Sequence, residues 1–228
     1  MVLDAGFMWQ EVKRIIKDVE LEATVRIFAP LGYGAEVMQV KIVNKGKDAR
    51  KISVTPAIPL YGRSADNLRD HRHVTSLLHR IKTSENGVIC KPVLSFDERG
   101  HQKNNMIYYV AGSTENGENP VSFFPTVASF IGESGTFLAP EALAKNQKGC
   151  GAGREFAGEE ALGAMTFAEI ILAPGQAQEY IVVSGMTESE EEITRTAEAF
   201  HTKEQADAAF IKAKESVSYT HLRAHETL

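Results

Sequence analysis

The first third of the chain alternates apolar and polar residues, and this pattern restricts the fold more than any other feature. A period of two is typical of a half-buried β-strand. Residues 21–29 (LEATVRIFA) and 36–43 (EVMQVKIV) are therefore predicted strands. Each gathers its apolar side chains on a single face: Val25, Ile27 and Ala29 in the first segment, and Met38, Val40 and Ile42 in the second.

Short turns connect these segments to a third one. Residues 30–34 (PLGYG) separate the first two, and residues 44–48 contain Gly46, which can adopt a positive φ. Residues 51–58 (KISVTPAI) are then predicted to return as a third strand. Three antiparallel strands joined by tight turns indicate a sandwich and argue against a βαβ fold. We therefore predict a mainly β, antiparallel protein.

Later segments continue the β pattern. Asn86-Gly87 is the strongest hairpin signal in the chain and joins predicted strands at residues 74–83 and 88–96. The segment from 123 to 153 has no long period. Its glycine-rich stretch, GCGAG, matches neither phosphate-binding spacing, so a surface loop is favoured. Further strands are predicted at the following ranges: 106–112, 166–173 and 178–184.

The pattern becomes helical near residue 188. Thr187 or Ser189 is expected to cap a helix over residues 188–200, and Thr202 with Gln205 forms a capping box for a second helix. We expect both helices to bury their apolar stripes on something beyond the sandwich. The stripes consist of Ile193, Ala197 and Phe200 in one helix, and Ala206, Ala209, Phe210 and Ala213 in the other.

These patterns divide the chain into three parts. Residues 1–187 are the predicted sandwich domain, and residues 188–215 are linker helices. Residues 216–228 (SVSYTHLRAHETL) follow neither pattern and resemble a translated sequencing adapter, so we interpret them as an artefact or a disordered tail.

Composition excludes several classes of protein. The chain has 228 residues and a formal net charge of −5, without the basic face that nucleic-acid binding requires. No run reaches the ~20 apolar residues of a membrane-spanning helix. No signal peptide is visible, so a cytoplasmic location is expected, with the caution that the true N-terminus lies upstream if the chain is a fragment.

Cys90 and Cys150 match no metal or redox spacing. Cys90 is predicted to be a buried hydrophobe, and a disulfide is the less favoured alternative.

Residues 61–80 (YGRSADNLRDHRHVTSLLHR) concentrate ionisable side chains between apolar segments. Such groups must pair, face solvent or line a site. His71 and His73 share one face of an extended chain, and Asp66, Asp70 and His79 are close to them in sequence. No zinc-binding pattern accompanies these residues, and the nearby arginines repel cations. We therefore predict no metal site. The alternative is an exposed loop held by two charge pairs, Arg63 with Asp66 and Arg69 with Asp70.

No complete catalytic constellation is present in the sequence. There is no G-x-S-x-G nucleophile motif, and the acids Asp66, Asp70, Asp97 and Glu98 cannot be placed at the separations that glycoside hydrolysis requires. Aromatic residues could form a sugar-stacking platform or belong to the core, and the core is favoured. The aromatic candidates are Trp9, Tyr61, Tyr108, Tyr109, Phe123 and Phe124.

Several segments resemble one enzyme family. Residues 56–83 (PAIPLYGRSADNLRDHRHVTSLLHRIKT), 94–112 (LSFDERGHQKNNMIYYVAG) and 123–137 (FFPTVASFIGESGTF) look like the N-terminal region of bacterial 1,2-β-oligoglucan phosphorylases. These enzymes belong to glycoside hydrolase family 94. FIGESGTFLAPEAL and IILAPGQAQEYIVVSG are similar to that family's more widely shared pattern, and the resemblance covers about residues 7–215.

The resemblance implies a β-supersandwich and linker helices, followed by an (α/α)₆ barrel that holds the general-acid Asp and the phosphate site. Inorganic phosphate, a co-substrate rather than a cofactor, would attack a β-glucan oligosaccharide with inversion and release α-glucose 1-phosphate. Nothing after Lys214 offers the barrel, so no catalytic residue is carried over and the fragment is expected to be inactive alone. The family is typically a homodimer. The candidates for the substrate rim are Arg63, Asp66, Arg69, Asp70 and His73.

Two alternatives remain open from the sequence. The chain could be a stand-alone carbohydrate-binding sandwich. It could also be a mutarotase-like sugar epimerase, which would need His71 or His73 beside a carboxylate.

Overall fold

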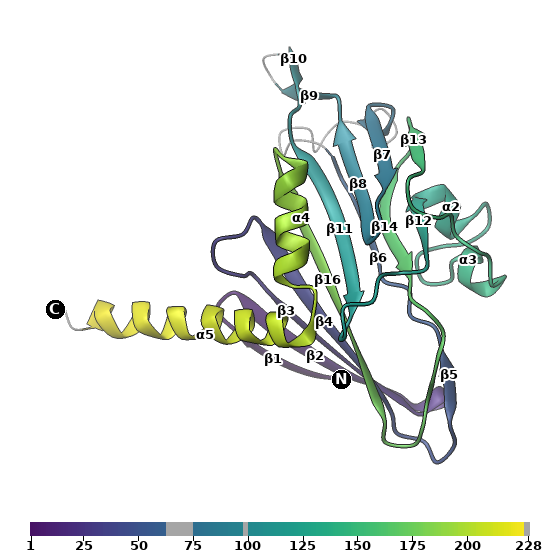
Figure 1. Ribbon diagram of the computed structural model, residues 1–228, viewed down its shortest axis with the longest axis vertical. Helices are drawn as coiled ribbons and strands as arrows, with labels where there is room; N and C mark the ends of the chain where they lie inside the picture. Colours follow the sequence, from purple (N-terminus) through teal and green to yellow (C-terminus); the bar gives the residue numbers. More distant parts are fainter. Residues whose placement is uncertain (63–74, 98–99, 226–228) are drawn as a thin grey trace.

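A nine-stranded antiparallel sheet forms the body of the protein (Figure 1). The computed structural model describes residues 1–62, 75–97 and 100–225. The strands lie in the spatial order β1 (Val2–Gly6), β2 (Trp9–Ile16), β3 (Leu21–Phe28), β4 (Ala35–Asn44), β16 (Ala177–Thr187), β11 (Ile107–Thr114), β8 (Gly87–Pro92), β7 (His79–Thr83) and β13 (Glu155–Ala157).

Shorter sheets form a second layer against one face of this sheet. A three-stranded sheet has the order β12 (Ser122–Thr126), β14 (Ala161–Thr166) and β6 (Ala57–Pro59). The remaining strand pairs are β15 (Ile170–Leu172) with β5 (Arg50–Ile52), and β9 (Leu94–Asp97) with β10 (Gly100–Lys103), which projects beyond the end of the large sheet (Figure 1). The predicted mainly β, antiparallel sandwich is confirmed.

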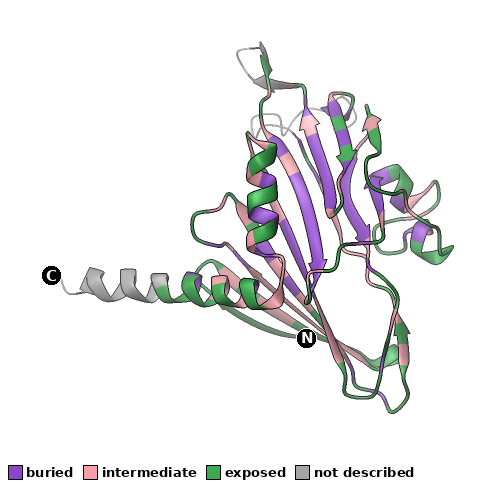
Figure 2. Cartoon of the chain, in the orientation of Figure 1, coloured by how far each residue is buried: buried purple, intermediate pink, exposed green. Residues whose placement is uncertain are grey.

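Central strands of the large sheet are buried on both faces. In β16, Ile181 and Val183 belong to one core cluster, whereas Tyr180 and Val182 belong to the cluster under the second layer. This explains why residues 180–183 are all apolar. Successive side chains of a strand point to opposite faces of the sheet, and here each face is covered by a core. Figure 2 shows this burial as mostly purple along β11 and β8, where only Tyr108 and Lys91 are intermediate.

Two local sequence signals predicted their structure correctly. Met38, Val40 and Ile42 of β4 all pack against the core under the second layer, as the alternation indicated. Asn86-Gly87 turns the chain between β7 and β8, which pair antiparallel, and Ser84 N donates to the Gly87 carbonyl at 2.8 Å.

The prediction of one strand over residues 51–58 was wrong. The chain forms two short strands there, and β5 pairs with β15 while β6 pairs with β14. The turn explains the difference: the buried Asn44 amide donates to the carbonyls of Asp48 and Leu172, at 2.8 and 2.9 Å. These bonds direct the chain into the second layer instead of back beside β4.

Two other strand boundaries also differ from the expectation. Residues 75–78 form a helical turn, so the strand predicted over 74–83 begins only at His79. The strand predicted over 166–173 is divided between β14 and β15, because the first ends at Thr166 and the second starts at Ile170.

The N-terminal hairpin was not predicted. Strands β1 and β2 pair from Val2 opposite Lys13 to Gly6 opposite Trp9, and a 3₁₀ turn, η1 (Lys17–Val19), leads into β3. Most side chains of β1 and β2 are exposed, so they lack the clean alternation of a strand with one buried face.

Helices cover parts of both layers. α2 (Val127–Ile131) starts with a capping box between Thr126 and Ser129, and α3 (Glu141–Ala144) follows Pro140. Ser189 caps α4 (Glu190–Ala199) by accepting from Glu191 N at 3.2 Å. Thr202 and Gln205 form the predicted capping box at the start of α5 (Lys203–His225).

The expectation that these two helices bury their stripes elsewhere was wrong. Ile193, Phe200, Ala206 and Ala213 join one core cluster with Phe28, Val37, Tyr109 and Ile181 of the nine-stranded sheet. The helices therefore form a layer on the face of the sheet opposite the short strands (Figure 1). Helix α5 continues to His225, and the origin of residues 216–228 stays a prediction.

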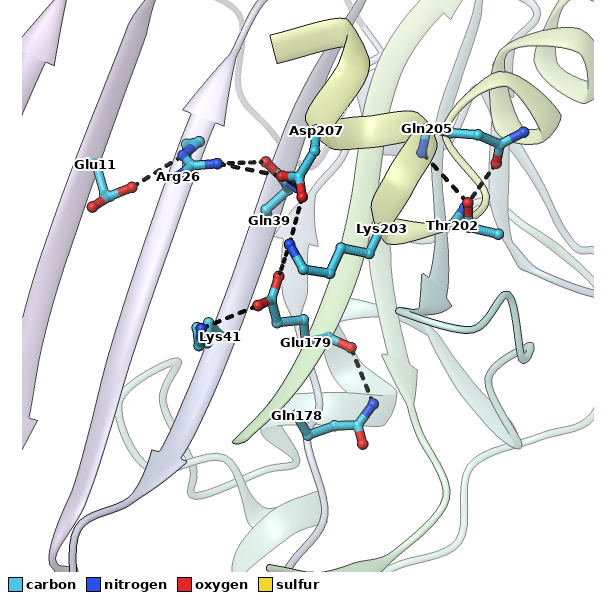
Figure 3. A network of polar contacts seen from close by, with 10 residues as sticks. All are labelled: Glu11, Arg26, Gln39, Lys41, Gln178, Glu179, Thr202, Lys203, Gln205 and Asp207. Carbon is cyan, nitrogen blue, oxygen red and sulfur yellow. Dashed lines mark hydrogen bonds and ion pairs between the residues drawn. The ribbon is translucent and has the colours of Figure 1, made fainter. Parts of the chain in front are cut away.

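A network of charged side chains fixes α5 across the sheet (Figure 3). Asp207 accepts from the Gln39 amide of β4 at 2.8 Å and lies 3.5 Å from the Arg26 guanidinium of β3. Lys203 pairs with both Asp207 and Glu179, the second at 3.2 Å. The network joins α5 to three neighbouring strands, β3, β4 and β16.

Candidate functional site

The five candidate rim residues lie outside the described residues. Because the described chain leaves off at Gly62 and resumes at Thr75, the rim stays a prediction. His71 lies outside the described residues as well, so the epimerase alternative is likewise untested. The five residues are Arg63, Asp66, Arg69, Asp70 and His73.

The ends that flank this segment meet at a small cleft. Tyr61 and Gly62 follow β6, whereas Thr75, Ser76 and His79 lead into β7, and all five line the cleft. Segments distant in sequence complete it: Glu160 precedes β14, Val127 begins α2, and Phe137 lies between α2 and α3. The space open to water in this cleft measures about 20 Å³.

His79 is the most buried ionisable side chain of the cleft, with an exposed fraction of 4%. Its Nδ1 lies 3.2 Å from the Glu159 carbonyl oxygen. Burial lowers the pKa of His79, against backbone contacts with Glu159 and Gly62 and the charge of Glu160, which raise it. The imidazole is therefore neutral at neutral pH.

Aromatic side chains from two segments stand at the mouth of the cleft. Tyr61 is 52% exposed and Phe137 is 44% exposed. Phe137 belongs to a tight turn in which Thr136 and Ala139 exchange backbone hydrogen bonds of 3.2 and 3.1 Å. Glu141 Oε1 accepts from Ser134 N at 3.0 Å just before this turn. These bonds hold an aromatic ring in solvent on a short, constrained loop.

Most other aromatic candidates belong to the core. Tyr109, Phe123 and Phe124 are buried, which confirms the favoured interpretation for them. Tyr108 packs partly against the core under the second layer, and Trp9 lies edge-on to Phe210 of α5 with ring centroids 5.6 Å apart. Tyr61 is the member of that set that lines the cleft.

A wider, open groove runs beside α4. It has a volume of about 470 Å³ and is lined by charged side chains of β7, β8, β13 and α4. Lys91 of β8 pairs with Glu190 at the start of α4, and this hydrogen bond holds the pKa of Glu190 below its ordinary value. The mixture of both signs is typical of a solvated surface. The charged residues are Arg80, Lys82, Lys91, Glu155 and Glu190.

The described part of the chain offers few groups for metal or thiol chemistry. No group of three or more His, Cys, Asp and Glu side chains there is arranged to hold a metal ion. Cys90 is buried and Cys150 is half-buried, and both are free thiols. None of the described helices is long and apolar enough to cross a membrane.

The fold defines a class of protein, the large β-sandwiches that carry a helical layer on one sheet. The chain belongs to glycosyl hydrolase family 94, because the sequence model of that family's supersandwich domain matches residues 10–203. A search of curated proteins gives no significant sequence match.

Three solved structures superpose on the chain at low sequence identity, and the first of them reaches a TM-score of 0.5. A bacterial glucoamylase in complex with acarbose superposes with a TM-score of 0.50 and 9% identity, over 91% of this chain and 25% of the glucoamylase. A polysaccharide lyase gives a TM-score of 0.42 and 8% identity over 83% and 23% of the two chains. A protein described as a kojibiose phosphorylase, from the human microbiome, gives a TM-score of 0.38 and 7% identity, over 91% of this chain and 20% of that protein. The chain thus spans about a quarter or less of the length of these structures.

Sequence reasoning missed most of the cleft. His79 was noted only as a neighbour of a possible metal pair, and Phe137 and Glu160 were not considered. Phe137 occurs in the widely shared segment FIGESGTFLAPEAL, which was the available signal. Glu160 carries no local pattern, since contacts across 80 residues bring its segment to His79.

Proposed function

We propose that this chain is the supersandwich region of an inverting β-glucan phosphorylase. In the proposed reaction an oxygen of inorganic phosphate attacks the anomeric carbon of a 1,2-β-oligoglucan. The glycosidic C–O bond breaks, and a general acid gives its proton to the leaving sugar oxygen. The products are α-glucose 1-phosphate and a shorter glucan. The family match over residues 10–203 carries this proposal.

Within that enzyme, the chain would supply the carbohydrate-binding rim and the dimer surface. The general acid and the phosphate site would belong to an (α/α)₆ barrel elsewhere in the polypeptide. Two observations support this division: the chain spans a quarter of the glucoamylase that it resembles, and the segment with the five rim candidates adjoins a cleft with exposed aromatics. The oligoglucan linkage rests on the sequence resemblance of residues 56–83.

A phosphorolysis assay tests the proposal. The 228-residue chain is incubated with β-1,2-glucan and phosphate, and α-glucose 1-phosphate is measured. We expect no release from the chain alone, and release from the polypeptide that the source DNA encodes when it is read beyond codon 215. Robust turnover by the chain alone would place catalysis within it and contradict the proposal.

The source DNA also separates the proposal from its alternative. An open frame that continues into a helical barrel supports the phosphorylase, and sedimentation velocity of that protein is expected to show a dimer. A natural stop near Lys214 would instead favour a stand-alone carbohydrate-binding sandwich.

A further inference from the structure

His79 lines the cleft and carries a buried ring nitrogen without a hydrogen-bond partner. A carbonyl oxygen can only accept, so the 3.2 Å contact with Glu159 assigns the proton of the neutral ring to Nδ1. Nε2 then keeps its lone pair. In the described part of the chain, Nε2 has no hydrogen-bond partner of normal geometry, although the side chain is almost fully buried and the Gly62 backbone lies close to this nitrogen. Such an orphaned acceptor is costly unless something donates to it.

The chemistry of Nε2 selects the kind of group that can bind there. A hydroxyl or a water molecule can donate to the lone pair, whereas a phosphate dianion or a carboxylate offers only acceptors. The hydroxyl-bearing side chains Thr75 and Ser76 line the same cleft, and both are buried. The cleft is therefore suited to a neutral ligand with hydroxyl groups.

The size of the cleft decides how such a ligand can lie. Its water-accessible space of about 20 Å³ admits a single water molecule or one hydroxyl group, because one water needs roughly 10–15 Å³ by this measure. A sugar ring is too large to enter. The ring must lie across the mouth, where Tyr61 and Phe137 expose about half of their side chains. Aromatic faces there can cover the apolar C–H face of a pyranose.

We propose that this cleft is a carbohydrate subsite, in which a pyranose ring lies against Tyr61 and Phe137 while one of its hydroxyl groups donates to His79 Nε2. The residues that carry the argument, Tyr61, His79 and Phe137, all belong to the described part of the chain. The inference rests on the proposed function for the choice of sugar, a β-1,2-linked glucan, and its test does not depend on phosphorolysis.

Titration calorimetry of the full 228-residue chain with a β-1,2-linked glucotriose measures the contribution of the aromatic residues. Cellotriose and laminaritriose serve as comparison probes. We expect Tyr61→Ala and Phe137→Ala each to weaken binding by about fivefold to tenfold. Leu138→Ala is the matched control, because Leu138 is the fully exposed neighbour of Phe137 in the same turn and does not line the cleft. It should bind as the unchanged chain does.

Nitrogen-15 NMR of the imidazoles tests the hydrogen bond directly. The seven histidines of the chain are distinguished by comparison with a His79→Gln variant. Addition of the trisaccharide should shift the Nε2 resonance of His79 while Nδ1 stays protonated. A purely structural role for His79 would leave this resonance unchanged.

The possible outcomes separate the two proposals. Three results would each overturn the subsite. They are no binding of any trisaccharide at millimolar concentration, equal binding by both aromatic variants and the control, and an unmoved Nε2 resonance. The third result would mean that an ordered water occupies the cleft. Binding that depends on Tyr61 and Phe137 and shifts Nε2, in a protein whose full polypeptide fails to form glucose 1-phosphate, would support the subsite and contradict the phosphorylase.

Discussion

The Asp207 carboxylate on α5 accepts a 2.8 Å hydrogen bond from the amide of Gln39 on β4. Gln39 is buried under the helix, and Arg26 lies within 3.5 Å of the same carboxylate oxygen. A contact between residues 168 apart in sequence thus fixes α5 to the sheet. Because the helix also covers an apolar core, its position affects the stability of the whole domain.

Replacing this carboxylate should weaken the attachment of α5. We expect Asp207→Asn to lower the free energy of unfolding by about 1–3 kcal/mol, the usual cost of leaving buried or charged partners unsatisfied. Urea unfolding at pH 7 measures the change. Asp18→Asn is the control, since Asp18 lies exposed in η1. Equal stability of the two variants would show that Asp207 contributes nothing.

The same carboxylate gives a pH dependence of known sign. Burial raises the pKa of Asp207, but hydrogen bonds from Lys203 and Gln39 outweigh burial and hold the pKa below its ordinary value. Its stabilisation is therefore complete above the unfolded pKa of about 3.9 and is lost as the pH falls through the lower folded pKa. The difference in unfolding free energy between the unchanged chain and Asp207→Asn should shrink from pH 6 to pH 2. A difference that stays constant would contradict this assignment.

Phe210 provides the apolar part of the same attachment. Its ring lies edge-on to Trp9 and Phe28, with centroids 5.6 and 5.4 Å away. Phe210→Ala should cost about 2–3 kcal/mol, at the low end for an aromatic truncation because the ring is only partly buried.

Trp9 reports on this change because it is the single tryptophan of the chain. Its fluorescence should respond to Phe210→Ala before global unfolding, as the indole loses its aromatic neighbour. Ile211→Ala is the matched control, since the next side chain along α5 is 54% exposed. That control should stay within about 0.5 kcal/mol of the unchanged chain.

The two thiols should differ in reactivity. Burial raises the pKa of Cys90 to about 12, and it also raises the pKa of Cys150, which is half-buried. Because the thiolate is the reactive form, Cys150 should react first with an aromatic disulfide reagent at pH 8. Cys90 should react only as the domain unfolds. A Cys150→Ser variant isolates Cys90, and rapid labelling of that variant in the native state would contradict the buried position.

Local patterns were sufficient for much of the fold. The alternation in β4, the Asn86-Gly87 hairpin and the helix cap at Thr202 each depend on residues close in sequence, and each was predicted correctly. Ser189, which caps α4, was one of the two caps predicted for that helix. Pairing between layers was not predictable in this way. The buried Asn44 amide directs the chain to β15 through a carbonyl 128 residues away, and no local pattern encodes that partner.

The same distinction applies to the helices and the site. The apolar stripe of α5 was visible in the sequence, but a stripe does not say which surface it will cover, and it covers the sheet itself. The cleft was less predictable, because Tyr61, Phe137 and Glu160 come from three separate segments. The rim candidates Arg63, Asp66, Arg69, Asp70 and His73 stay a prediction.

Gly135 allows the turn that carries Phe137. A Cβ at this position would lie 1.9 Å from the Ile131 carbonyl oxygen and 2.9 Å from Glu141 N, so α2 and α3 leave no space for a side chain. Gly135→Ala must therefore displace backbone, and we expect a loss of about 1–3 kcal/mol, the usual cost of overpacking.

Gly151 offers a matched comparison. A Cβ there would meet nothing within 4 Å, and its φ is not positive, so Gly151→Ala should be neutral. Thermal unfolding of the two variants measures the contrast. If the displaced turn also moves Phe137, then Gly135→Ala should weaken trisaccharide binding while Gly151→Ala leaves it unchanged. Equal stability of the two alanine variants would mean that the turn tolerates a side chain at Gly135, and that the close approach of α2 and α3 does not hold Phe137 at the cleft.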